Sequence, residues 1–223
     1  MESPVKDSLY RILPFHRLVQ ILKTGRWYFA HPSEWEDPYE VRRTTKLSPY
    51  LFSQCWCRTA VSDAMWRIYS NDGLGVRIRV SQAKLQARLE ESAESSGFKF
   101  LIRKVKYIKQ TELTALEAAW TQSTKEPSFA EGTTHLFRKR LPFDHEAETR
   151  VVILDKRHST ANGPKGYPVH LEPTPLIESI FLDPRAPTEL TDALRHYLKN
   201  KMLFPGHVAK SSLYKLDTRK EAQ

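Results

Sequence analysis

The chain has 223 residues, of which 35 are Lys or Arg and 26 are Asp or Glu, so its formal net charge is +9. Hydrophobic residues make up 40% and aromatic residues 11%, which excludes a disordered chain and favours one buried core. No apolar run approaches the roughly 20 residues that cross a bilayer, and the first residues lack an apolar signal segment. We therefore expect a soluble, cytoplasmic protein with no membrane partner. We also expect one domain over residues 1–216 and a basic tail over 217–223.

Short strands and helices alternate along the chain without the regular βαβ repeat of a doubly wound fold. Hydrophobic periodicity and turn residues place strands at 9–13, 27–30, 51–57, 76–80, 98–108, 149–154 and 177–182, and helices at 14–24, 64–70, 81–96, 113–120 and 188–202. Gly25 is suited to end the first helix in a left-handed conformation, and Ser62 is suited to begin the second. This pattern predicts an α+β fold with a mixed or antiparallel sheet and flanking helices.

Two strand patterns carry further expectations. In the strand at 76–80, Arg77 and Arg79 alternate with apolar residues, which is typical of a half-exposed strand. Cys55 and Cys57 lie two residues apart and so share a strand face, and we interpret them as reduced core residues. The eight histidines show no metal-ligand spacing, so we predict no bound metal.

The most unusual string runs from Phe143 to Leu154 and is rich in charge at its start. If this string is a strand, Glu146, Glu148 and Arg150 share one face, which turns apolar further along. A carboxylate at such a position is partly desolvated, and a neighbouring arginine keeps it ionised. The alternative interpretation is a salt-bridged start of a strand with a purely structural role.

Aromatic and basic residues near the start of the chain provide candidate ligand contacts. Arg11 lies on the first strand, where its planar guanidinium can bind a phosphate or a carboxylate. Trp66 and Tyr69 lie three residues apart on one side of a helix, and can wall a flat ligand or simply pack in the core. Asp37 precedes a proline and is therefore held extended in its loop.

These strings, in this order, are similar to a bacterial family known as domain of unknown function 2971. The matching pieces are Leu9-Tyr10-Arg11, Leu22-x-x-Gly25-x-Trp27-Tyr28-Phe29, Trp35-x-Asp37-Pro38-Tyr39-Glu40, Met65-Trp66-x-x-Tyr69, Gly73-x-Gly75-Val76, Glu146-x-Glu148-x-Arg150 and Ser211-x-Leu213-Tyr214. The chain departs from the family pattern at Glu36, where Asn is frequent. It also departs at Cys55-Trp56-Cys57, where Cys-Phe-Ser is frequent, and these departures leave the substrate open.

In its layout the chain also resembles ADP-ribosyltransferase-like folds, in which an early strand bears Arg or His, an aromatic helix follows and a late strand bears Glu. The resemblance is to the branch that modifies DNA and RNA, found among toxins and phage-defence effectors. It implies a glycosyltransferase of ADP-ribosyl type that consumes NAD as its substrate. The implied acceptor is a nucleic acid or a protein, and the implied partner is an antidote protein from the same system.

The same resemblance implies roles for individual residues. Glu148 would stabilise the cation that forms on the ribose as nicotinamide leaves, with Glu146 as the alternate and Arg150 orienting the carboxylate. The implied cofactor-binding residues are Tyr10, Arg11, Trp66, Tyr69 and Asp37. Among these, Arg11 would hold the pyrophosphate, and Trp66 and Tyr69 would orient the nicotinamide ring, with Tyr10 nearby.

Two other functions stay open. In a nucleic-acid-binding or metal-dependent nuclease-like effector, the runs Arg42-Arg43 and Arg138-Lys139-Arg140 would bind phosphates, and in the nuclease Glu146 and Glu148 would hold a divalent ion. In a non-enzymatic partner domain, the same motif residues would only hold the fold together.

Overall fold

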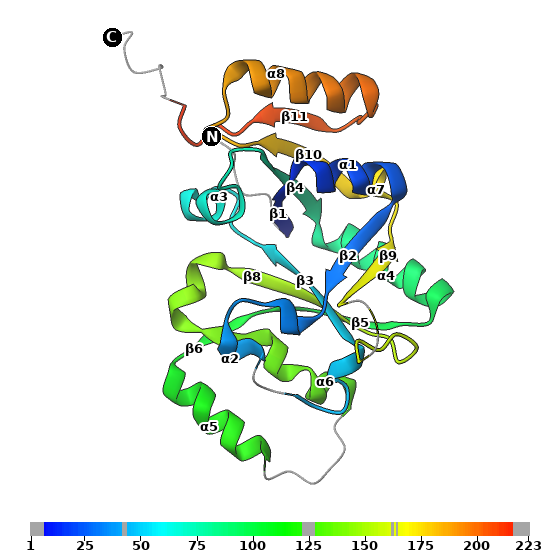
Figure 1. Cartoon of the computed structure of the whole chain (residues 1–223), viewed down its shortest axis with the longest axis vertical. Helices are drawn as coiled ribbons and strands as arrows, with labels where there is room; N and C mark the ends of the chain where they lie inside the picture. Colours follow the sequence, from blue (N-terminus) through cyan, green and yellow to red (C-terminus); the bar gives the residue numbers. More distant parts are fainter. Residues whose placement is uncertain (1–6, 42–43, 122–127, 162, 164, 216–223) are drawn as a thin grey trace. The chain divides into compact units, whose positions relative to one another are not determined.

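The computed structural model describes residues 7–41, 44–121, 128–161, 163 and 165–215. The chain forms two compact units, each assembled from separate stretches: unit 1 takes residues 1–25, 59–84 and 172–223, and unit 2 takes residues 26–58 and 85–171. The colours of Figure 1 let these stretches be followed along the sequence. The single domain expected over 1–216 stays a prediction, and the tail expected at 217–223 lies outside the described residues.

Unit 1 contains a mainly antiparallel sheet with helices against it. Its elements are β1 (Ser8–Pro14), α1 (Phe15–Thr24), α3 (Asp63–Tyr69), β4 (Gly75–Ser81), α7 (Pro173–Leu176), β10 (Ile177–Leu182), α8 (Thr188–His196), the π-helical turn η5 (Tyr197–Lys201) and β11 (His207–Lys210). The strand order is β11-β10-β4-β1, in which only the β10–β11 pairing is parallel among the described strands of this unit. Helix α8 lies along β11 (Figure 1).

The helices of unit 1 begin and end where local signals predict. Gly25 has φ 64° and donates its N–H to Ile21 O at 2.8 Å, which closes α1. The side chain of Ser62 accepts from Met65 N and caps α3. The helix expected at 188–202 stops at His196 and continues as η5.

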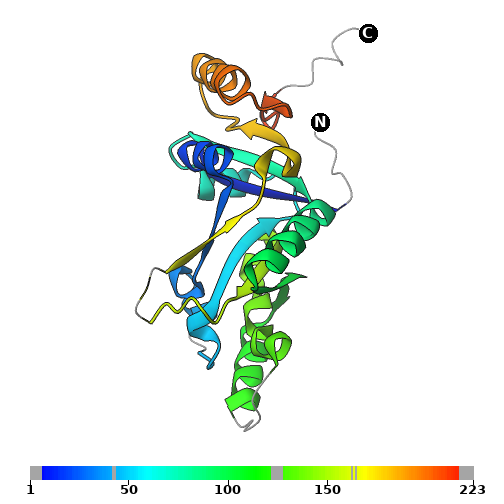
Figure 2. The ribbon, with the colours of Figure 1, turned by 90° about the vertical axis from the view of Figure 1, so that its right-hand side faces the viewer.

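Unit 2 contains a set of antiparallel strands, the separate parallel pair β6–β7 and most of the irregular structure. Its elements are β2 (Arg26–Ala30), the 3-10 helices η1 (Pro32–Glu34), η2 (Ser48–Tyr50), η3 (Thr134–Phe137) and η4 (Leu141–Glu146), the helices α2 (Pro38–Val41), α5 (Gln110–Thr121) and α6 (Phe129–Gly132), and the strands β3 (Leu51–Cys57), β5 (Lys99–Lys104), β6 (Lys106–Ile108), β7 (Arg138–Arg140), β8 (Glu148–Leu154) and β9 (Gly166–His170). Helix α4 (Gln82–Ser96) begins in unit 1 and continues into unit 2. The strand order is β9-β2-β3-β8-β5, and β2 and β9 run side by side (Figures 1 and 2).

The strand expected at 98–108 is two strands that belong to different sheets. β5 pairs with β8, whereas β6 pairs in parallel with β7, a short strand that the sequence pattern does not reveal. Val105 separates them and donates its N–H to Glu148 O at 3.0 Å. The predicted α+β class with a mainly antiparallel sheet is confirmed.

The core of unit 2 is built around β8, whose seven residues are all buried. β3 and β5 pair with it on its two sides, so this strand has no exposed edge along those pairings. Its second half packs into an apolar cluster with Leu51, Leu136 and Phe137. The first half of β8 carries charge into this buried position and forms the centre of the candidate site.

Candidate active site

Glu148 and Arg150 share one face of β8, as their spacing predicts. Arg150 Nε donates to Glu148 Oε2 at 2.5 Å, and the Arg150 side chain is only 1% exposed. The same face continues into Val152 and Leu154, which belong to the apolar cluster. The change from charged to apolar along this face of β8 is therefore confirmed.

Glu146 does not lie on this strand, which corrects the expectation that three charged residues share its face. Glu146 ends η4, and Ala147 after it is left-handed, with φ 45° and ψ 49°. Non-glycine residues rarely adopt this conformation. Ala147 N donates to Asp144 O at 3.0 Å and closes the turn. The strand parity is broken here, so the position of Glu146 depends on the turn.

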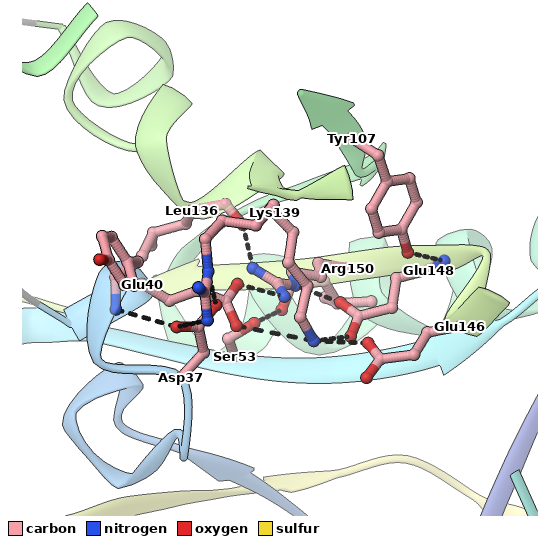
Figure 3. A network of polar contacts seen from close by, with 12 residues as sticks. Asp37, Glu40, Ser53, Tyr107, Leu136, Lys139, Glu146, Glu148 and Arg150 are labelled. Carbon is pink, nitrogen blue, oxygen red and sulfur yellow. Dashed lines mark hydrogen bonds and ion pairs between the residues drawn. The ribbon is translucent and has the colours of Figure 1, made fainter. Parts of the chain in front are cut away.

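Lys139 brings the two carboxylates together, and sequence reasoning missed this role. Its Nζ lies 2.5 Å from Glu146 Oε2, 3.1 Å from Glu148 Oε1 and 3.6 Å from Glu40 Oε2 (Figure 3). The Lys139 side chain is 8% exposed. It therefore does not belong to a basic run that binds phosphates. A three-residue strand of basic residues has no apolar alternation that would reveal which one is buried.

Glu40 and the loop before it enclose Arg150 from the other side. Arg150 Nη2 lies 2.5 Å from Glu40 Oε1, and its Nη1 donates to Leu136 O at 2.7 Å (Figure 3). The guanidinium lies 4.3 Å from the ring centroid of Trp35. Glu40 and Trp35 stand in a matching motif piece, but the sequence assigned neither a role.

Asp37, predicted to bind the cofactor, is buried and holds this loop in place. Its carboxylate accepts from Arg140 at 3.0 and 3.2 Å, and from Tyr39 N at 3.0 Å. The Arg140 guanidinium lies 4.2 Å from the ring centroid of Tyr39 and 5.2 Å from that of Phe143. Cofactor binding by Asp37 stays a prediction, and its observed contacts are to the protein.

The buried network contains more acid than base, and this sets the protonation of its carboxyl groups. Its charged members are Glu40, Glu146, Glu148, Lys139 and Arg150. Burial, together with the Glu148 carboxylate, raises the pKa of Glu146 to about 7, against the opposing effect of Lys139. Burial also acts on Glu148, but Arg150 and the bond to Glu146 outweigh it and lower the pKa of Glu148 to about 2. Glu148 is therefore ionised in the range where Glu146 takes up a proton.

Burial and neighbouring charges also shift the pKa values of the groups around Glu146 and Glu148. Burial raises the pKa of Glu40, despite the nearby Arg150 and Lys139. Burial disfavours the charged form of Lys139, but the surrounding carboxylates outweigh it and raise its pKa. Tyr107 accepts from Glu148 N at 2.8 Å, and burial raises the pKa of its hydroxyl group.

Four predicted cofactor-binding residues belong to unit 1. Trp66 is 0% exposed and Tyr10 is 4% exposed, so both pack in the core of this unit. Tyr69 is 44% exposed, and Arg11 is half-buried on β1. Their contacts with a ligand stay predictions, and of the aromatic pair on α3 only Tyr69 offers an exposed ring.

Arg77 is buried, which corrects the half-exposed strand expected there. It is 3% exposed and donates to the carbonyl of Ala60. Its guanidinium lies 4.8 Å from the ring centroid of Phe181, 5.3 Å from that of Tyr10 and 5.9 Å from that of Trp66. Three aromatic faces stabilise this buried cation. The alternation of its strand is typical of a solvent-facing arginine and gave no sign of these rings.

Two hollows are present within the described part of unit 2. The first is open to solvent and measures about 400 Å³ with that open space included; residues of α2, α5 and β7 line it, among them Glu40 and Arg138. The second, about 360 Å³, shares Glu40 and His135 with the first. Glu40, a member of the buried network, therefore lines both hollows.

Several sequence expectations concern features that the described residues do not contain or that lie outside them. Among the described residues, no group of three or more His, Cys, Asp or Glu side chains is arranged to hold a metal ion. None of the helices in the described part of the chain is long and apolar enough to cross a membrane. The basic pair Arg42-Arg43 lies outside the described residues. Cys55 is half-buried, Cys57 is buried, and the two are not joined by a disulfide.

The sequence matches one family model over part of its length. Residues 65–151 match the model described as "Protein of unknown function (DUF2971)". This confirms the resemblance for three motif pieces, Met65-Trp66-x-x-Tyr69, Gly73-x-Gly75-Val76 and Glu146-x-Glu148-x-Arg150. The other matching pieces lie outside this range. None of the curated proteins compared with the sequence matches it.

The solved structures that match include complexes of DarT from Thermus sp. 2.9. The complex with NAD⁺ has a TM-score of 0.41 at 14% identity and covers 95% of this chain and 98% of that chain. The complex with carba-NAD⁺ has a TM-score of 0.38 at 16% identity and covers 94% and 97%. The complex with ADP-ribosylated ssDNA has a TM-score of 0.41 at 14% identity and covers 92% and 94%.

Proposed function

We propose that this chain is an ADP-ribosyltransferase-like enzyme that consumes NAD and transfers its ADP-ribosyl group to a nucleic acid or a protein. The observation that carries this proposal is the ionised Glu148 carboxylate, held between Arg150 and Lys139 beside a second carboxyl group. Cleavage of the nicotinamide–ribose bond develops positive charge on the ribose. A carboxylate that the fold has already positioned stabilises that charge, because it does not have to move or change its hydrogen bonds during the reaction.

The residues of the network fit a dinucleotide substrate at the ribose. An ionised carboxylate has about four acceptor positions, and at Glu148 one each is taken by Arg150, Lys139 and the carboxyl group of Glu146. Acceptor capacity therefore remains for a ribose hydroxyl group. Arg150 keeps the carboxylate both ionised and oriented, because it is itself held by Glu40 and Leu136 O.

Glu146 and Glu148 have different roles in the proposed transfer. The bond between ribose C1′ and the nicotinamide nitrogen breaks, its electron pair leaves with nicotinamide, and a bond forms between C1′ and the acceptor atom. The proton released by the acceptor passes to Glu146, whose raised pKa suits a group that exchanges a proton near neutral pH. Glu148 stays ionised throughout and stabilises the cationic ribose.

The rest of the implied NAD site is part of the proposal and is supported by the sequence resemblance. Arg11 would bind the pyrophosphate and Tyr69 would contact the nicotinamide ring, while Tyr10 and Trp66 would shape the site from the core. The implied biological setting is a cytoplasmic bacterial toxin or phage-defence effector with an antidote or partner protein.

The proposal is tested by measuring nicotinamide release from NAD, with wild type beside Glu148→Gln, in the presence of single-stranded DNA, RNA or protein acceptors. The substitution keeps the shape and removes the charge, so we expect release to fall by about 10² to 10³-fold. Glu94→Gln is the matched control, because Glu94 is an exposed residue of α4 in the same unit. The control should release nicotinamide at the wild-type rate.

Two results would overturn the proposal. Wild type that neither binds nor cleaves NAD with any of these acceptors removes the activity itself. A Glu148→Gln variant that releases nicotinamide at the wild-type rate shows that Glu148 is not the catalytic carboxylate. Thermal unfolding of the variant is the folding control: if its melting temperature is unchanged, a fall in rate does not come from unfolding.

The nuclease-like alternative places a divalent ion between Glu146 and Glu148. In the structure the Lys139 ammonium group lies between these carboxylates, at 2.5 and 3.1 Å. A cation of the protein thus takes the position that this alternative needs for the ion, so the transferase is the function that the geometry favours.

A further inference from the structure

The three consecutive basic residues of β7 have three different surroundings. Lys139 is buried among carboxylates, and Arg140 is paired with Asp37. Arg138 is half-buried and lines the open hollow beside Glu40, and its side chain makes no hydrogen bond or ion pair with the part of the chain that the structure describes. Of these three cations, Arg138 is the one whose guanidinium is available to a ligand.

The acids around this hollow are already paired with other cations. Asp37 is held by Arg140 at 3.0 Å, and Glu40 by Arg150 at 2.5 Å. A half-buried guanidinium group that has lost part of its hydration is stabilised by an anion in direct contact. Because the lining acids are taken, that anion is expected to come from a ligand.

The lining of the hollow also indicates what kind of anion it accepts. The planar guanidinium of arginine binds the oxygens of a phosphate through two parallel hydrogen bonds. Leu113 and Leu116 of α5 and the ring of Tyr39 provide apolar surface beside Arg138. A phosphate joined to a ring-bearing organic group fits these features together.

We propose that this hollow is a binding subsite for a phosphate group of a nucleotide, with Arg138 as its ligand. The subsite deepens the proposed function, on which the choice of a nucleotide rests. The phosphate has two sources with the same chemistry, the pyrophosphate of the dinucleotide and the backbone of a nucleic acid acceptor. Separate binding measurements distinguish these sources.

The test compares wild type, Arg138→Gln and Arg138→Lys for binding of ADP-ribose by calorimetry and of a single-stranded DNA oligonucleotide by fluorescence anisotropy. Arg138→Gln should weaken binding of the ligand that supplies the phosphate by about tenfold. Arg138→Lys keeps the charge but not the planar group and should lose less. If the phosphate belongs to DNA, the slope of log K against log salt concentration should also be smaller in magnitude by about one for Arg138→Gln than for wild type.

Arg103→Gln is the matched control, because Arg103 is an exposed arginine on β5 of the same unit and packs on Phe137 outside the lining of this hollow. It removes the same charge and should leave binding of both ligands near the wild-type value. A loss with ADP-ribose alone, with DNA alone or with both supports the subsite and identifies the source. Equal affinities for wild type and Arg138→Gln, or equal losses in Arg138→Gln and Arg103→Gln, overturn it.

The outcome of this test is separate from that of the proposed function, because binding is measured without NAD cleavage. A chain that binds ADP-ribose through Arg138 but never releases nicotinamide would keep the subsite and overturn the transferase. A chain that releases nicotinamide in a Glu148-dependent manner, with binding unchanged in Arg138→Gln, would overturn only the subsite.

Discussion

At the scale of single residues, burial sets the protonation of the candidate site. The groups that face Glu146 come from three elements: Lys139 from β7, Glu148 from β8 and Tyr107 from β6. Of these, only Lys139 is a cation, and it is shared with Glu148 and Glu40. Burial and the neighbouring Glu148 carboxylate therefore outweigh Lys139 at Glu146 and raise its pKa to about 7.

This arrangement predicts a pH dependence of the free energy of unfolding. The pKa of Glu146 is raised from 4.5 to about 7, so between these pH values the folded chain binds more protons than the unfolded chain. Stability from this group is present below pH 4.5 and is lost as pH rises to about 7, by up to about 3 kcal/mol. Glu146→Gln should flatten this decline and make the variant more stable than wild type above pH 7.

Urea unfolding at a series of pH values measures this difference. Glu94→Gln, at an exposed position, should keep the wild-type decline. The raised pKa of Glu40 acts in the same direction and leaves a smaller residual slope in Glu146→Gln. Equal slopes for wild type and Glu146→Gln would show that Glu146 is already ionised in this range.

At the scale of elements, β8 and β10 are each followed by a turn in which an aspartate binds the arginine two residues later. After β8, Asp155 Oδ1 accepts from the backbone N–H of Arg157 at 3.0 Å, and its Oδ2 accepts from the guanidinium at 2.7 Å. After β10, Asp183 Oδ1 and Oδ2 make the same bonds to Arg185, both at 2.7 Å. Each turn holds its arginine in one orientation through a buried carboxylate.

Each of these arginines then binds the C-terminal end of a helix in its own unit. Arg157 donates to Ser96 O at the end of α4. Arg185 donates to Trp66 O at 3.2 Å and to Ser70 O at the end of α3. A cation at this position binds carbonyl groups of the last helical turn and interacts favourably with the negative end of the helix dipole. The Asp183–Arg185 turn therefore fixes α3, which bears the predicted nicotinamide contacts.

Removal of one arginine should loosen one helix. Arg185→Ala leaves a buried carboxylate without its partner and should lower the free energy of unfolding by about 2–3 kcal/mol. Hydrogen exchange of the amides of residues 63–70 should become faster in this variant. In Arg157→Ala, the matched control, faster exchange should be confined to the end of α4. Faster exchange of α3 in both variants would contradict a local role of Arg185.

At the scale of the whole molecule, the net charge of +9 does not by itself mark a nucleic-acid surface. Lys139, Arg150 and Arg77 are buried, and their charges are satisfied by carboxylates or aromatic rings. The partners of these three cations lie inside the units, so the cations are not part of a charged surface. What the charge offers to a ligand depends on individual residues such as Arg138.

The interleaving of the two units along the chain predicts how the molecule unfolds. The chain passes from one unit to the other after residues 25, 58, 84 and 171, and α4 has its first turn in unit 1 and the rest in unit 2. Because neither unit is one continuous segment, we expect a single cooperative transition, with calorimetric and van't Hoff enthalpies in agreement. Differential scanning calorimetry measures both enthalpies.

Variants in each unit provide the control for this prediction. Arg185→Ala in unit 1 and Arg157→Ala in unit 2 should each shift the same transition. A variant that splits the transition in two would show that the units unfold independently, and would overturn the expectation of one domain over 1–216.

The sequence by itself determined most of the elements of this protein and the charged start of β8. Local rules place the helix ends at Gly25 and Ser62. They also place Glu148 and Arg150 on one strand face. Caps, turns and strand parity involve only residues close in sequence. The break at Val105 and the strand β7 escaped these rules, because pairing partners decide where a short strand begins and ends.

Only the tertiary structure decided which charges are buried and what they bind. Lys139 and Glu40 meet across nearly one hundred residues of sequence, and Arg77 is enclosed by rings from three separate segments. A charged residue looks solvent-exposed in any local pattern, because its burial becomes favourable only when distant partners surround it. The candidate site follows from that long-range compensation.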